Sequence, residues 1–454
     1  MGLSSALSIT NEALQAQQTA LETTANNIAN VNTPGYTRQV TQLAEQAPFA
    51  GTSGVGGGVG VEQIQSIRDS VLELRLNQEN QTQTSLTAMQ QQLGPVEALF
   101  STSGGAGLGT AIDNFFNSLQ QLSTDPTSGA ARQSAITAAQ TLTQTFNQVA
   151  GSVQQQQLGA DQQVVQDVSQ ANSYLSQIAA LNGQIASAQN SHQNTGPLID
   201  QRTTAIRSLS GLMSFYVSNG SNGQVTLTTG AGSQLVVGTD ATSLSTQPNG
   251  SGLHQILAGG TDITSSLTGG ALAGLVQARD QTLPQLSSQL DQLASGIASA
   301  VNSQNALGYT PSGAAGGNIF TPPPATGAAS VMSMATTDPN AIAASGDGTP
   351  GDNSNLLKLA GVQQQAVSGG LTPDNAYASI VSSIGSVISG VNTQQQASSV
   401  VLTQLQNQRD AISGVSLDQE SIALNQFQQA FNAAARVVTV VNTLTSLAIN
   451  LGKD

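Results

Sequence analysis

The chain contains no cysteine and no tryptophan, and few of its residues are charged. Without cysteine it can form neither a disulfide framework nor a thiolate metal site. Its 25 Asp and Glu outnumber its 11 Lys and Arg, which gives a formal net charge of −14. This acidic balance argues against nucleic-acid binding, because phosphate contacts need clustered basic side chains.

Long apolar runs are missing as well. No uninterrupted apolar run of about 18 residues occurs, so we expect no transmembrane helix and no membrane insertion. The first residues, MGLSSALSIT, place no basic region before an apolar stretch, so we expect no Sec-type signal peptide. Aromatic residues make up 3% of the chain and hydrophobic residues 38%. We therefore expect a thin core rich in Ala, Leu and Val, which suits long slender helices.

An apolar stripe marks the first expected helix. Leu7, Leu14, Leu21 and Ile28 recur at intervals of seven residues, as on one face of a coiled-coil helix. So narrow a stripe leaves the helix marginal on its own in water. We expect it to pack against a partner helix, and the pattern fits a partner in the same subunit as well as one in a neighbour. A sharper hypothesis is that both chain ends fold only on assembly.

The first helix is expected to end in the segment ANNIANVNTPGY, residues 25–36. The Pro-Gly pair fits the centre of a type II turn, and a helix stop with a turn explains this much. We favour the further hypothesis that side-chain amides fix the exit geometry by bonding to the backbone. A buried amide would also select the register between helices, so Asn30→Leu is expected to impair assembly more than monomer folding. The candidate residues are Asn26, Asn27, Asn30, Asn32, Pro34, Gly35 and Tyr36.

The last expected helix has the most regular stripe. Its apolar positions alternate by three and four residues, and Ser416 with Gln419 forms a capping-box pair before it. The stripe comprises Phe427, Ala430, Ala434, Val437, Val441, Leu444, Ala448 and Leu451. The economical arrangement brings the two ends of the chain together. From this end we select Phe427, Phe431, Val437, Val441 and Leu444 as assembly candidates, beside the leucine stripe of the first helix.

The middle of the chain combines helices with a short β segment. Residues 215–238 contain two Asn-Gly turn signals between apolar runs and predict three strands. A loop-rich stretch covers about 309–355. Helices rich in Gln and Ala are expected over 61 to about 100, 110 to about 193, 197–213, 270–305 and 373–412.

These elements predict a mainly α fold with a smaller β part. Both chain ends and their flanking helices would form a long helical bundle or coiled coil, with an inserted β-rich domain. The expected divisions are a terminal coiled-coil domain (1–45 plus 415–454), a long-helix bundle domain (46–213 plus 268–306 plus 356–414) and a β-rich inserted domain (214–267 plus 307–355).

Several segments, in order along nearly the whole chain, resemble one protein family. ANNIANVNTPGY resembles the signature that ends the first helix of flagellar rod, hook and hook-associated proteins. Four further segments resemble the hook-associated branch of that family. They are GGGVGVEQIQSIRDSVLELRL (56–76), LIDQRTTAIRSLSGLM (198–213), GLVQARDQTLPQLSSQLDQLASGIASAVN (274–302) and SGVSLDQESIALNQFQQAFNAAARVVTVVNTL (413–444).

The resemblance implies a structural protein that forms the junction between the flagellar hook and filament. It implies a ring of identical subunits, contacts with the hook protein and with the adjacent hook-associated protein, type III export without cleavage, and no cofactor. It also implies that an export chaperone binds the C-terminal segment, around residues 420–454. The candidates for that site are Ile422, Phe427, Phe431, Val438, Leu444 and Leu447.

Other functions find little support in the residues. The Gly-rich segment 51–60 lacks the third glycine of a dinucleotide fingerprint and no Gly-Lys-Ser/Thr follows. His192 and His254 have no spaced ligands around them, so no metal site is expected. We therefore expect no catalytic residues. The alternatives are another axial protein, from the hook or distal rod, or a secreted adhesin or surface hydrolase with a coiled-coil stalk.

Overall fold

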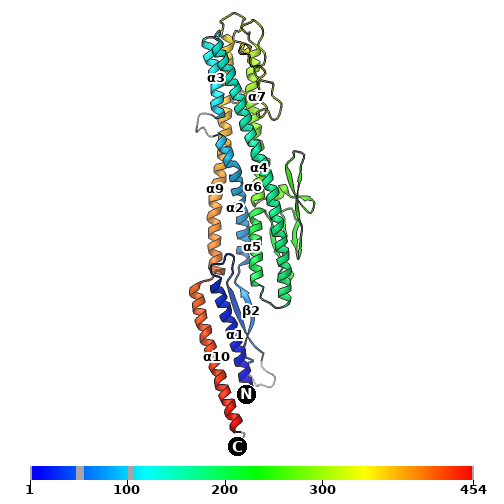
Figure 1. The fold of residues 1–454 in the computed structure, drawn as a ribbon, viewed down its shortest axis with the longest axis vertical. Helices are drawn as coiled ribbons and strands as arrows, with labels where there is room; N and C mark the ends of the chain where they lie inside the picture. Colours follow the sequence, from blue (N-terminus) through cyan, green and yellow to red (C-terminus); the bar gives the residue numbers. More distant parts are fainter. Residues whose placement is uncertain (1–2, 48–55, 101–106, 452–454) are drawn as a thin grey trace.

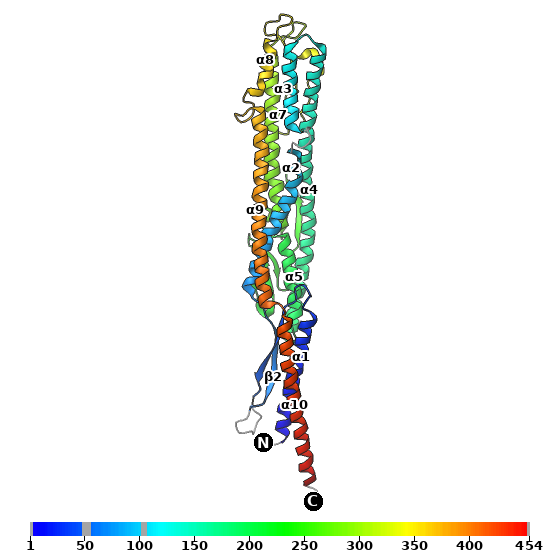
Figure 2. The ribbon, with the colours of Figure 1, turned by 90° about the vertical axis from the view of Figure 1, so that its left-hand side faces the viewer.

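The computed structural model describes residues 3–47, 56–100 and 107–451. The molecule is elongated, and its long helices run close to parallel with the long axis (Figures 1 and 2). The α-helices are α1 (Leu3–Ala29), α2 (Ser70–Phe100), α3 (Leu108–Thr124), α4 (Gly129–Asn190), α5 (Gly196–Leu212), α6 (Ala271–Gln277), α7 (Leu283–Ala306), α8 (Ser354–Ala360), α9 (Pro373–Ser413) and α10 (Leu417–Leu451). A π-helical turn, Ala278–Thr282, joins α6 to α7.

The strands are short and belong to three antiparallel sheets. They are β1 (Gln39–Glu45), β2 (Val59–Ser66), β3 (Tyr216–Asn219), β4 (Val225–Thr228), β5 (Gln234–Val237), β6 (Asp240–Ala241), β7 (Leu244–Pro248), β8 (His254–Ala258) and β9 (Thr261–Asp262). The strand orders are β1-β2, β3-β4-β5-β6 and β7-β8-β9. The predicted fold class, mainly α with a smaller β part, is confirmed.

Both chain ends lie at one end of the molecule (Figure 1). There α1 and α10 pack side by side in opposite directions, and the hairpin β1-β2 lies against α1. We call α1, this hairpin and α10 the terminal unit, and the remaining helices and sheets the rod. The two units meet at the joint, which comprises the exit loop 30–38 and the crossing segments 67–69 and 414–416.

The rod has two hydrophobic cores. One includes Phe115, Phe146 and Phe320 and lies among α2, α3, α4, α7, α8 and α9. The other includes Leu175 and Val236 and joins the second half of α4 to α5, α6 and the sheets of β3–β9. No residue of α1 or α10 that the structure describes belongs to either core.

Buried amides hold the small sheets on α4. The side chain of Asn172 exchanges two hydrogen bonds with the backbone of Leu244, at 2.8 and 2.7 Å. Asn182, which is completely buried, bonds to the backbone of Val225 and Gly238. These bonds, together with the core that the sheets share with α4, α5 and α6, make the β segment an attachment of the rod rather than a separate globule.

The start of one predicted helix needs correction. The helix expected from residue 61 begins only at Ser70, because residues 59–66 pair with 39–45 as a hairpin. The apolar residues of 61–67 recur every three residues, which favours a helix, but the pairing with β1, which includes a register shift between Gln42 and Leu43, makes the segment a strand. Of the Gly-rich segment 51–60, residues 51–55 lie outside the described residues.

The structure also divides the chain differently from the expected domains. Residues 307–355 do not join the β segment 214–267, because Phe320 and Ile342 pack into the core among α3, α4 and α7. A boundary at residue 45 would cut the hairpin that packs on α1. The terminal unit therefore extends to residue 66 at its N-terminal side.

Candidate assembly surface and joint

The leucine stripe of α1 is only half-buried in the subunit. Leu7, Leu14, Leu21 and Ile28 all keep part of their surface exposed. The positions that α1 buries are smaller and more polar: Thr10, Ala16, Ala20, Thr23, Thr24 and Asn27. Sequence reasoning selected Asn27 but missed the others, although Ala16, Ala20 and Thr24 recur every four residues. Small side chains at that spacing let a partner helix approach closely, which leaves the larger leucines at the edge of the contact.

On α10 the predicted residues divide between two faces. Val441 is buried, and Phe427, Phe431 and Val438 are half-buried. Four large apolar residues are exposed by about half or more: Ile422 at 59%, Val437 at 47%, Leu444 at 47% and Leu447 at 56%. With Val440, which is 57% exposed, they form what we call the outer face of α10. The subunit itself leaves this face uncovered.

By length and composition alone, one helical stretch could cross a membrane. It lies within Pro373–Asn450, and its most apolar window has a mean hydropathy of 1.2 and is 6% buried. The expectation drawn from uninterrupted apolar runs missed it, because polar residues interrupt the apolar ones. That same interruption gives α10 its periodic stripe, which is typical of helix-to-helix packing.

The asparagine-rich exit of α1 contains one fully buried amide. Asn27 is 1% exposed. Its side chain bonds to both backbone groups of Gln39, at 2.8 and 3.0 Å, and donates to Oε2 of Glu420 at 3.0 Å. Asn27 therefore ties the end of α1 to β1 and to the start of α10. Asn30, by contrast, donates only to Asn26, one turn earlier in the same helix.

Tyr36 closes the exit loop over the same amides. Its hydroxyl lies 3.0 Å from Oδ1 of Asn26 and 2.8 Å from Oδ1 of Asn27. Burial, with the nearby charges of Asp200 and Glu420, raises the pKa of Tyr36 to about 12. The phenol therefore stays protonated and donates a hydrogen bond at neutral pH.

The turn before Tyr36 requires glycine. Gly35 has a φ of 81°, and a Cβ there would lie 2.8 Å from Oγ1 of Thr204. Asn32 and Pro34 are exposed. They shape the turn and touch nothing that would identify them as contact residues within the subunit.

Two carboxylates that sequence reasoning missed hold the joint. Glu420 of α10, 2% exposed, accepts from Nε of Arg38 at 2.6 Å. Asp200 of α5, 8% exposed, accepts from Thr37 and from Arg68. Their partners lie 132 to 382 positions away along the chain, so no local pattern could have paired them.

A third group of charges lies beside these two. Glu73 of α2 accepts from Arg207 of α5 at 2.9 Å and lies 3.5 Å from Arg409 of α9. Arg409 also reaches the backbone oxygen of Tyr36 at 3.5 Å. Glu73 thus joins three rod helices directly behind the exit loop.

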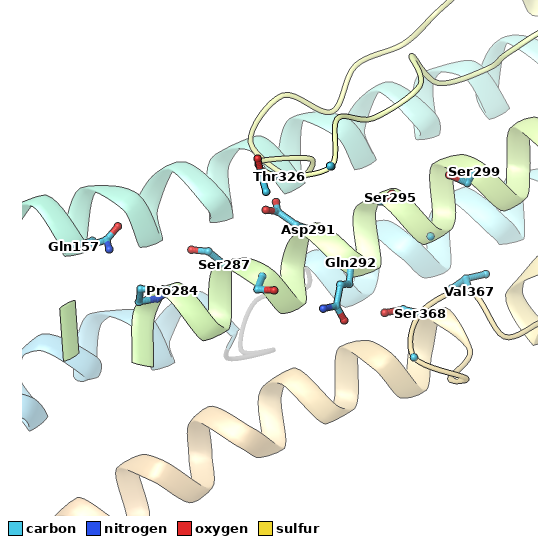
Figure 3. Close-up of a pocket in the computed structure, with 14 residues that line it drawn as sticks. Gln157, Pro284, Ser287, Asp291, Gln292, Ser295, Ser299, Thr326, Val367 and Ser368 are labelled. Carbon is cyan, nitrogen blue, oxygen red and sulfur yellow. The ribbon is translucent and has the colours of Figure 1, made fainter. Parts of the chain in front are cut away.

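One groove of the rod is lined mainly by neutral side chains. Figure 3 shows this groove along α7, with a volume of about 790 Å³, lined by short neutral side chains such as Ser287, Ser295 and Gln292. Its carboxylate, Asp291, already accepts the backbone N–H groups of Gly327 and Ala329. Among the residues that the structure describes, no cluster of three or more His, Asp or Glu could hold a metal ion.

Comparison with known proteins assigns the chain to a class. Residues 93–320 match the family model described as the flagellar hook-associated protein FlgK helical domain, and residues 7–37 match that of the flagella basal body rod protein. The flagellar hook-associated protein 1 of Bacillus subtilis is 30% identical over 99% of this chain and 98% of its own length. That of Escherichia coli is 28% identical over 99% of this chain and 100% of its own length.

The fold agrees with a solved structure. The flagellar hook junction protein FlgK from Burkholderia pseudomallei matches with a TM-score of 0.67 at 22% identity, covering 75% of this chain and 100% of the other. Helical termini around a joint and an exposed apolar face fit the class that these comparisons name, the structural proteins of the bacterial flagellum. The chain belongs to the flagellar hook-associated protein 1 family, whose members form the junction between hook and filament.

Proposed function

We propose that this protein builds the junction as a ring of identical subunits that associate through the terminal unit. The outer face of α10 carries this proposal. Exposed Val437, Val440 and Leu444 would each gain roughly 25 cal/mol for every Å² of apolar surface removed from water. Soluble monomers rarely leave such a stripe uncovered unless it binds a partner.

The partners on the two sides of the ring are axial proteins. We propose that one side contacts the hook protein and the other contacts the adjacent hook-associated protein on the filament side. The low charge of the terminal helices supports contacts of this kind. Between Glu420 and residue 452 the only charged residue is Arg436, so copies with a net charge of −14 can bring these helices together with little repulsion.

The same face of α10 is available before assembly. We propose that an export chaperone binds α10 inside the cell, contacting Ile422, Leu444 and Leu447 on the outer face and Phe427, Phe431 and Val438 on the half-buried face. An apolar helix face laid in a groove is a common mode of recognition. Covering it would prevent premature association of the subunits.

We further propose that the protein is exported by the flagellar type III apparatus, acts outside the cell and catalyses no reaction. The groove described above lacks a nucleophile paired with a base, which supports a purely structural role.

Deletion of the gene tests the proposal. The expected result is cells that keep their hooks but lack filaments, with filament subunits shed into the medium, and immunogold labelling of the restored protein at the hook–filament boundary. Filaments of normal number and attachment on the deleted strain would contradict it.

A further inference from the structure

Only two peptide segments connect the terminal unit to the rod. The chain crosses between the terminal unit and the rod twice, through residues 67–69 after β2 and through 414–416 after α9. Each crossing is three residues long. Two short peptide links that lie next to each other leave rotation of one unit against the other largely free. One backbone hydrogen bond, from the N–H of Arg38 to the C=O of Ser413 at 2.9 Å, holds the exit loop to the end of α9, and side-chain contacts must fix the freedom that remains.

One rod residue makes more of those contacts than any other. Oδ1 of Asp200 accepts from Oγ1 of Thr37 at 2.5 Å and from Nη2 of Arg68 at 2.6 Å. Oδ2 accepts from the backbone N–H of Thr37 at 3.2 Å. Thr37 belongs to the exit loop and Arg68 to the crossing segment after the hairpin. A single carboxylate of α5 thus accepts hydrogen bonds from two separate parts of the chain at the joint.

The other contacts across the joint are weaker. Asn194 donates to Oε1 of Gln39 at 3.1 Å, and Arg409 reaches the backbone oxygen of Tyr36 at 3.5 Å. Each is a single bond, and the second lies at the limit of hydrogen-bond distance. Besides its pair with Asp200, Arg68 donates to the backbone oxygen of Gly196 at 3.2 Å and to Oγ1 of Thr203 at 3.4 Å. Asp200 combines an ion pair with two further bonds in a nearly buried position, where charge-assisted bonds are strongest.

The burial of Asp200 makes its bonds specific to one arrangement. A carboxylate that is 92% withdrawn from solvent, since its exposure is 8%, loses hydration that only its three donors replace. A rotation of the terminal unit that moved Thr37 away would leave the charged carboxylate of Asp200 with fewer hydrogen-bond donors in a poorly solvated site. Other angles between the units are therefore disfavoured.

We propose that Asp200 is a positioning residue that fixes the angle of the terminal unit against the rod. This inference rests on the proposed function, since a fixed angle matters where copies must enter a ring with their terminal helices aligned. The device itself lies within one subunit. It can therefore be tested on the monomer, where failure of ring formation has no influence.

Because the chain contains no cysteine, spin labels would attach only to cysteines that are introduced for a distance measurement. Cysteines introduced at exposed Gln404 of α9 and Gln428 of α10 would carry spin labels on either side of the joint. Double electron–electron resonance on the full-length monomer then reports the distribution of distances between them. The expected distribution is single and narrow in the otherwise unchanged chain, and about twice as wide in Asp200→Ala.

A second variant and a control separate positioning from folding. Thr37→Val keeps the Arg68–Asp200 pair and removes the hydroxyl bond of the exit loop, so the distribution should also widen. Gln201→Ala changes an exposed neighbour of Asp200 that makes no hydrogen bond described for it, and should leave the width unchanged. Thermal unfolding by circular dichroism checks that the rod stays folded. An unchanged width in Thr37→Val, or in a folded Asp200→Ala, overturns the proposal.

Discussion

The buried amide of Asn27 allows the sharpest prediction. Asn27→Ala leaves the N–H and C=O of Gln39 without their partners, in a residue that is 6% exposed. It also removes one donor from Glu420, which keeps Arg38. A buried polar group left unpaired costs about 1–3 kcal/mol. Two stranded backbone groups therefore predict that the free energy of opening the terminal unit falls by about 2–6 kcal/mol.

Asn30→Ala is the matched control. Asn30 has the same side chain three residues further on, but it bonds only to Asn26 and Thr33, which are close in sequence and exposed. Its loss is expected to cost less than about 1 kcal/mol. Native-state hydrogen exchange at the amides of α1 and β1 measures both variants. Equal effects of the two substitutions, or no effect of Asn27→Ala, would refute the reasoning that burial decides which amide matters.

Three further predictions concern the rod. Burial raises the pKa of Asp161, but hydrogen bonds from His254 of β8 and the charge of Arg279 lower it by more. The net result is a pKa below the ordinary value of 3.8. The ionised carboxylate of Asp161 therefore stabilises the fold above pH 3.8, and this stabilisation is lost as the pH falls through the lowered pKa. Hydrogen exchange of the β8 amides should accelerate in that pH range. Asp161→Asn should abolish this pH-dependent acceleration. Gly274→Ala would drive a Cβ into the backbone oxygen of Ser85 and should destabilise the rod by about 1–3 kcal/mol in chemical denaturation. Gly390→Ala, whose Cβ would meet nothing within 4 Å, should stabilise α9 by about 0.5–1 kcal/mol; a destabilised Gly390→Ala would contradict this account of the two sites.

The long helices were predictable because their periodicity extends over many turns. Helix α10 is the clearest case, since its stripe runs without interruption and the structure places the helix at Leu417–Leu451. The strands of 215–238 were predictable from the two Asn-Gly turns, and the structure forms β3, β4 and β5 there. In both cases the signal is local.

What the sequence could not predict depends on distant partners. The hairpin β1-β2 was missed because the apolar residues of 61–67 recur at helical spacing, and only the pairing with Gln39–Glu45 makes the segment a strand. Four asparagines in the exit segment look equivalent in sequence. Only the packing of β1 and α10 around Asn27 distinguishes it from Asn30. The pairing of Asp200 with Thr37 likewise spans 163 positions.

The central claim is that the outer face of α10 joins neighbouring subunits, and one measurement tests it most directly. The double variant Val437→Ser, Val440→Ser removes two exposed apolar side chains that lie outside the proposed chaperone residues, with Asn442→Ser as an exposed polar control. Filaments are counted by electron microscopy on the deletion strain that carries each variant, and exported protein is measured in the medium. The double variant should be exported yet leave the hooks bare, whereas the control restores filaments. Normal filament numbers with the double variant would contradict the claim.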